Sequence, residues 1–159
     1  MTTYQSNPSS PASLSMDSFE EADSTNYVEV IETVIASLAR EKSAMVSHPG
    51  EGYLWKFSYG TVEVFVQLTG MTDEDTFTVW SPVLKLPAKN EATLMHKLLE
   101  MNWGETFEAR FGLFNNQVVV LTSRSLTGLC AAEISQGITV VASIADEQDG
   151  ALQSEFGAE

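Results

Sequence analysis

The feature that constrains this fold most strongly is a strict alternation of apolar side chains over residues 53–68. Every second residue in two successive runs would face the same side of a strand: Tyr53, Trp55, Phe57 and Tyr59, then Val62, Val64, Val66 and Leu68. Only Gly60 and Thr61 separate the two runs. So short a link joins antiparallel strands, and the sequence therefore predicts a β-hairpin with one face that must be covered.

Three further strands are expected, over residues 76–86, 107–114 and 117–123. Pro82 implies an edge position or a bulge in the first of them, because proline cannot donate to a strand ladder. Asn115 and Asn116 tolerate positive φ and predict a tight turn between the other two.

Three segments have apolar residues at helical spacing: residues 27–38, residues 91–101 with Asn90 as N-cap, and residues 126–156. In the last segment, Gly137 would permit a close approach to the sheet. Val140, Val141 and Ile144 nearly encircle the helix axis, so we expect a partner subunit to cover a second side. The sum is an α+β fold of order α-β-β-β-α-β-β-α, with an antiparallel five-stranded sheet packed against helices.

Length and composition predict one domain, over residues 25–156. Residues 1–24 are rich in Ser, Thr and Pro with scattered acids, which is typical of a disordered acidic tail. Within it, Leu14, Met16 and Phe19 could form a short docking motif.

The charge and the cysteine content restrict the partners and the compartment. The formal net charge of −14 opposes binding to nucleic acid or to an anionic membrane. The longest apolar stretch, residues 138–145, is far shorter than the roughly 20 residues of a membrane span. The lone Cys130 lies in an apolar stretch and is expected to be a small core residue. We therefore expect a cytoplasmic protein.

The residue types that carry chemistry are sparse. His48, His96 and Cys130 are too few and too scattered for a zinc site or an activated nucleophile. The acidic runs at residues 73–75 and 146–150 do not follow a calcium-binding loop, and loops that cradle phosphate are missing. The sequence predicts no catalytic residue, no metal site and no cofactor.

Aromatic residues on the second side of the predicted strands are the features that point to a function. Phe65 lies opposite the valine face of its strand, Trp80 lies among threonines, and Phe114 is out of step with Phe111. If helices cover one face of the sheet, these residues form an apolar patch on the other. Burial in a homodimer, a partner-binding patch and plain core are the open interpretations. Phe65, Trp80 and Phe114 are the candidate partner-binding residues.

Local sequence features add a family resemblance over residues 25–156. The opening helix begins Tyr27-Val28-Glu29-Val30-Ile31, an aromatic strand reads Tyr53-Leu54-Trp55-Lys56-Phe57, and the last helix runs from Ile138 through Leu152 to Phe156. With the element order, these features resemble the bacterial type III secretion chaperones and the related YbjN-like domains, including small proteins of this kind that recur in cyanobacteria.

The resemblance implies an acidic homodimer that binds another polypeptide over apolar patches and sheet edges, or a regulatory domain of the same shape, without a cofactor. The Ser/Pro-rich tail is not part of the chaperone pattern, so secretion chaperone activity is not carried over.

Two functional hypotheses follow. The favoured one is a non-enzymatic, chaperone-like or regulatory protein-binding module that acts as a homodimer. The alternative is a small-molecule sensor or enzyme with a site between sheet and helices. Such a site needs polar groups that converge on a pocket, and His96, Glu63, Arg110 and Arg124 are the candidates.

Overall fold

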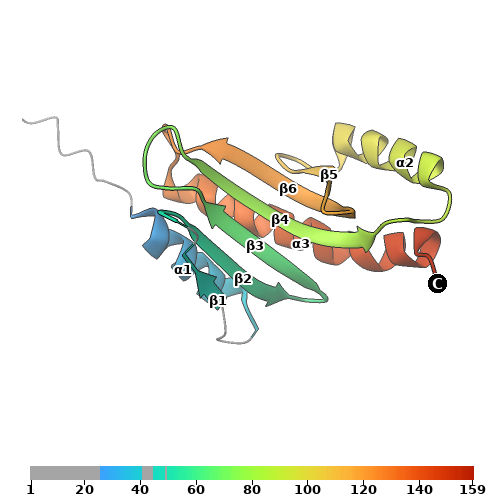
Figure 1. Ribbon diagram of the computed structural model, residues 1–159, viewed down its shortest axis with the longest axis horizontal. Helices are drawn as coiled ribbons and strands as arrows, with labels where there is room; N and C mark the ends of the chain where they lie inside the picture. The colour runs from blue at the N-terminus through green and yellow to red at the C-terminus, as the bar shows by residue number, and fades with distance from the viewer. Residues whose placement is uncertain (1–25, 41–44, 49) are drawn as a thin grey trace, which may run out of the picture.

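The computed structural model describes residues 26–40, 45–48 and 50–159, and the predicted tail over residues 1–24 lies outside them. The helices are α1 (Tyr27–Leu38), α2 (Glu91–Gly104) and α3 (Ala131–Phe156). The strands are β1 (Met45–Ser47), β2 (Tyr53–Tyr59), β3 (Val62–Leu68), β4 (Thr76–Lys85), β5 (Arg110–Phe114) and β6 (Gln117–Ser125). All pairings are antiparallel, in the order β1-β2-β3-β4-β6-β5. Figure 1 shows α3 along the back of this sheet, α1 near the β1 edge and α2 near β5.

The predicted α+β class and element order are confirmed, but the sheet has six strands rather than five. The additional strand, β1, is three residues long and pairs with β2 through Val46 and Trp55. Its brevity explains why alternation alone does not reveal it, because three residues cannot establish a period of two.

The predicted starts of β5 and α3 are wrong by a few residues, whereas α2 begins at Glu91 as predicted. β5 begins at Arg110, because Phe107 has a φ of 53° and is exposed. α3 begins at Ala131, and the buried Leu126 and Leu129 belong to the preceding turn. Asn90 precedes α2 with a φ of 51° and makes no side-chain cap; the Glu91 carboxylate instead accepts a hydrogen bond from the Ala88 N–H at 2.9 Å.

The alternating residues of the sheet form the core. Their side chains are fully buried on the side of the sheet that carries α3, as in Trp55, Val64 and Val79. Ile138 and Val141 of α3 are equally buried against them. The predicted hairpin alternation therefore corresponds to the observed core, as the period of a half-buried strand requires.

The second side of α3 is covered by α1, not by a partner subunit as the sequence suggested. Ile31 and Ile35 of α1 are buried and belong to the same core as Val141. Gly137 brings α3 close to the sheet as predicted, because a Cβ there would lie 3.3 Å from the Phe77 ring. The prediction that α3 is buried on two sides was correct, but α1 of the same chain covers the second side.

β4 is a central strand that contains a bulge, so the edge position allowed for Pro82 is wrong and the bulge is correct. The register shifts between Pro82 and Leu84. The adjacent Ser81 is fully buried and donates a hydrogen bond to the Glu63 carbonyl of β3 at 2.7 Å. This side-chain bond adds a link between β3 and β4 beside a residue that has no N–H to contribute.

Candidate functional site

The face of the sheet that points away from α3, here called the open face, is turned toward the viewer in Figure 1. One cross-strand row on it links five strands in direct register: Lys56, Phe65, Trp80, Leu121 and Arg110. Residues directly opposite each other on paired strands point to the same side of the sheet. The row therefore has three apolar residues in its middle and one cation at each end.

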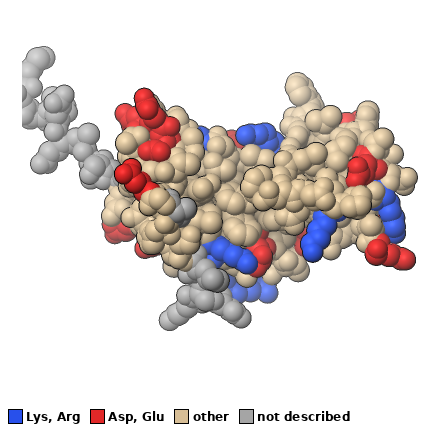
Figure 2. All heavy atoms as spheres, viewed as in Figure 1, with Lys and Arg blue, Asp and Glu red and all other residues tan. Residues whose placement is uncertain are grey.

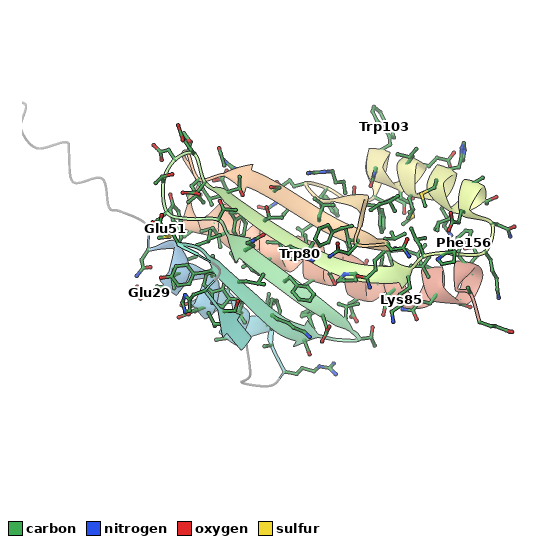
Figure 3. All side chains as sticks on the ribbon, in the orientation of Figure 1. Glu29, Glu51, Trp80, Lys85, Trp103 and Phe156 are labelled. Atoms are coloured by element: carbon green, nitrogen blue, oxygen red, sulfur yellow. The ribbon has the colours of Figure 1, made fainter. Side chains whose placement is uncertain are left out.

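The three aromatic residues predicted from the sequence come together on this face. The Phe65 and Trp80 rings are stacked with centroids 5.2 Å apart, and the Phe114 ring meets Trp80 edge-on at 5.9 Å. Both distances lie within the range that favours aromatic pairs. Phe65 and Trp80 are half-buried, whereas Phe114 is 50% exposed. We call Phe65, Trp80 and Phe114 the aromatic patch; Figure 3 shows Trp80 near the centre of the sheet.

The surface beside the aromatic patch is hollowed. A groove of about 840 Å³ is lined by all three aromatic residues, by the charged residues Glu63, Lys85 and Asp149, and by residues near the end of α3 such as Gly157. A smaller hollow of about 240 Å³ is lined by Trp80, Phe114 and Leu121. Trp80 and Phe114 line both spaces, so a ligand in either one would contact them.

Gly112 leaves space for an apolar residue of the open face, and Thr78 and Ser123 form a polar pair beside it. A Cβ at Gly112 would lie 2.7 Å from Leu121, so the missing side chain leaves room for Leu121 to lie over β5. The Thr78 and Ser123 hydroxyls form a hydrogen bond of 2.8 Å between β4 and β6. The apolar row is thus bordered by polar side chains that satisfy each other.

The charges around the aromatic patch are mostly positive. Lys56 forms an ion pair of 2.6 Å with Glu63 and lies 5.7 Å from the centre of the Phe65 ring. Lys85 and Arg110 are exposed, and neither has a carboxylate partner among the residues that the structure describes. Figure 2 shows a largely uncharged middle of this face with cations and carboxylates scattered around it.

The four polar residues of the alternative hypothesis do not converge on one pocket. His96 pairs with Glu100 on the exposed side of α2. Arg124 forms an ion pair with Glu133 of α3. Glu63 pairs with Lys56 on the open face, where Arg110 ends the cross-strand row. The space between sheet and helices is filled by the apolar core instead.

Cys130 is exposed, and its predicted place in the core is wrong. It is the N-cap residue of α3, and its backbone N–H donates to the Glu133 carboxylate at 3.0 Å. This hydrogen bond and the one from Arg124 lower the pKa of Glu133 below its ordinary value. The apolar neighbours Leu126 and Leu129 are buried instead, so the local hydrophobicity was correctly read but assigned to the wrong residue.

The two acidic runs serve local structure. Asp75 accepts hydrogen bonds from Thr72 and Thr69 within the loop between β3 and β4. Asp146 and Asp149 both accept from the Thr61 hydroxyl, which ties the β2–β3 turn to α3. Across residues 26–40, 45–48 and 50–159, no cluster of three His, Cys, Asp or Glu is placed to hold a metal ion. Within the same ranges, every helix is too short or too polar to cross a membrane.

An exposed apolar surface at α2 was not predicted from the sequence. Leu99, Trp103 and Phe107 are 71%, 94% and 87% exposed, and we call them the α2 apolar edge. Figure 3 shows Trp103 pointing away from the sheet at the end of α2. The spacing of these residues in the sequence could have indicated this surface. Leu99 and Trp103 are four residues apart and share a side of the helix away from the buried Leu94 and Leu98.

Comparisons with known proteins agree with this architecture. The model of the YbjN family, described as "Putative bacterial sensory transduction regulator", matches residues 27–154. A chain from the crystal structure of the ExsC–ExsE complex has a TM-score of 0.56 at 13% sequence identity, covering 77% of this chain and 90% of that one. No curated protein matches the sequence. The predicted resemblance to YbjN-like and type III secretion chaperone-like domains is confirmed at the level of family and fold.

Proposed function

The chain belongs to the YbjN family, and from this premise we propose that it is a non-enzymatic, regulatory protein-binding module that holds another polypeptide on its open face. The observation that carries the proposal is the aromatic patch of Phe65, Trp80 and Phe114, which lies in and beside a groove of about 840 Å³. Exposed apolar patches of this kind usually mark an interface. The family description and the fold shared with a chain of the ExsC–ExsE complex support this reading.

The chemistry of the groove suits a polypeptide ligand. Clustered aromatic residues dominate binding energies because they bury a large apolar area with few rotatable bonds. Lys85 and Arg110 at the margin can pair with partner carboxylates, and the half-buried Gln67 and Gln117 can bond to a main chain. Apolar anchors inside a polar rim are the usual anatomy of a protein interface.

We further propose that the protein works as a homodimer in the cytoplasm. Support for self-association comes from the α2 apolar edge, where Trp103 is 94% exposed. A second copy would bury that edge symmetrically, as most homodimers do. The single cysteine, Cys130, is free and exposed, which suits a reducing compartment.

The binding proposal is tested by partner capture with full-length baits in extract of the native cell. Phe65→Asp places a charge in the middle of the aromatic patch. Loss of one aromatic hot spot costs about 2 kcal/mol or more, so we expect at least a roughly 30-fold weaker capture of the wild-type partner. Met71→Asp is the control, because Met71 is apolar, 48% exposed and outside both the aromatic patch and the α2 apolar edge.

Circular dichroism establishes that both variants fold. A polypeptide recovered with wild type and Met71→Asp but lost with Phe65→Asp supports the proposal. A partner that Phe65→Asp captures as well as wild type would contradict it.

A further inference from the structure

The charge on the open face is opposite in sign to the charge of the chain. The net charge of the chain is −14. On the open face, however, the described strand residues present Lys56, Lys85 and Arg110 against one carboxylate, Glu63. A second carboxylate at the groove, Asp149 of α3, accepts a hydrogen bond from the Thr61 hydroxyl. Since Glu63 already pairs with Lys56, the cations that remain favour an acidic ligand. The aromatic patch between them favours apolar side chains, so the face suits a segment that combines both properties.

One segment of this chain has that combination. Residues 14–23 read Leu-Ser-Met-Asp-Ser-Phe-Glu-Glu-Ala-Asp, with three large apolar side chains interleaved with four carboxylates. There is no Lys or Arg in residues 1–25. Its chemistry therefore complements an apolar face with cationic margins.

The described structure begins within reach of the aromatic patch. The Tyr27 hydroxyl, at the start of α1, donates to the Leu126 carbonyl at 3.3 Å, and the Leu126 N–H donates to the Asp75 carbonyl at 3.0 Å. These bonds tie the start of α1 to the start of β4. Trp80 is four residues further along that strand, about 13 Å away. The eight residues from Phe19 to Tyr27 can span up to about 26 Å, enough to turn the end of the sheet.

We propose that residues 14–23 dock on the open face of their own chain, with Phe19 and its apolar neighbours on the aromatic patch and the carboxylates toward Lys85 and Arg110. This inference rests on the proposed function, because it assigns an internal competitor to the same binding face. A short tether gives such a competitor an effective concentration of the order of millimolar, so an external partner must displace it. The tail thereby sets a threshold for partner binding.

The test uses the full-length chain with one nitroxide label and nitrogen-15 detection. Ser18→Cys places the label within the segment without removing an apolar or acidic residue, and Cys130→Ser removes the native thiol while keeping a good N-cap for α3. A nitroxide broadens nearby proton signals. We expect the Trp80 indole N–H signal to be lost and that of Trp103, which points away from the sheet at α2, to persist.

Charge and apolar variants test the chemistry. Lys85→Glu with Arg110→Glu should restore the Trp80 signal, as should Leu14→Ser, Met16→Ser and Phe19→Ser combined. Arg40→Glu with Lys89→Glu makes the same change in net charge at exposed positions outside the open face and should leave the signal broadened. Salt near 1 M, where the Debye length is about 3 Å, should weaken the broadening. A persistent Trp80 signal in the labelled parent chain would overturn the inference.

The source of the occupant is tested by mixing. Spin-labelled chain without nitrogen-15 is combined with unlabelled nitrogen-15 chain, and the Trp80 signal should survive. Its loss there would assign the occupant to a second copy and overturn docking within one chain. If Phe65→Asp abolishes partner capture while the label leaves Trp80 unaffected, the proposed function stands and this inference fails. If the label broadens Trp80 but capture does not depend on Phe65, only the proposed function fails.

Discussion

At the scale of a residue, the half-buried carboxylate of Asp75 organises the loop between β3 and β4. Its Oδ2 accepts hydrogen bonds from the Thr72 N–H at 2.9 Å and the Thr72 hydroxyl at 2.7 Å, and its Oδ1 accepts one from the Thr69 hydroxyl at 2.9 Å. These bonds favour the charged form, so the pKa of Asp75 lies below its ordinary value of 3.8, with the Thr72 hydroxyl as the largest cause. The loop between β3 and β4 therefore depends on ionised Asp75.

Replacement of Asp75 predicts a defined pH dependence of stability. Because its folded pKa is lowered, Asp75 contributes stability at pH values above 3.8, and this contribution is lost as the pH falls through the lower folded pKa. Asp75→Asn should be less stable than wild type at pH 7, and the difference should shrink below pH 3.8. Urea unfolding across that range measures it, with the neighbouring Asp73→Asn as control. A difference that is constant with pH would contradict the assignment.

At the scale of an element, α3 holds two interior glycines in different surroundings. Gly137 is buried against the sheet, where an added Cβ would lie 3.3 Å from the Phe77 ring and 3.4 Å from a Thr122 methyl. Gly150 is exposed, and an added Cβ would meet nothing within 4 Å. The first glycine is required by the packing of α3 on the sheet, while the second only weakens the helix.

Substitution of the two glycines should change stability in opposite directions. Gly137→Val should destabilise the fold by about 1–3 kcal/mol, because its methyl groups would overlap Phe77 and Thr122. Gly150→Ala should stabilise it by up to about 1 kcal/mol through helix propensity alone. Denaturant unfolding followed by circular dichroism gives both values. Equal effects of the two substitutions would show that α3 does not approach the sheet closely at Gly137.

At the scale of the whole molecule, two apolar surfaces remain at different places. The aromatic patch lies on the open face, and the α2 apolar edge lies at the end of the sheet near β5. Since α1 already covers the second side of α3, burial of α3 gives no reason for self-association. The α2 apolar edge is the surface on which the proposed homodimer depends.

A substitution at Trp103 tests that dimer. Trp103→Glu would place a charge on the α2 apolar edge and should convert a wild-type dimer into a monomer, as measured by light scattering coupled to size-exclusion chromatography. Met71→Glu is the control, because Met71 is 48% exposed in the loop between β3 and β4. A wild type that is monomeric at all concentrations, or a Trp103→Glu variant that still dimerises, would contradict the proposal.

The sequence predicted the long alternating strands correctly, but it did not predict the exact ends of α3 and β5 or the short strand β1. The period-2 pattern over residues 53–68 correctly predicts β2, β3 and their pairing, because alternation is local and one face must be buried. Cys130 and Phe107 were misplaced because the exact ends of α3 and β5 depend on turn conformations, including a φ of 53° at Phe107. The three-residue β1 is held by its pairing with β2, which no local pattern encodes.

The sequence by itself determined the fold class, the element order and the identity of three aromatic residues outside the core pattern, because these follow from periodicities along the chain. Only the tertiary structure decided that Phe65, Trp80 and Phe114 share one patch and that Lys56 and Arg110 end a single row across five strands. Their juxtaposition depends on the register of strands up to 54 residues apart, from Lys56 to Arg110, and on the bulge beside Pro82. Register is a property of the assembled sheet, so the shape and charge of the open face emerge only when it is formed.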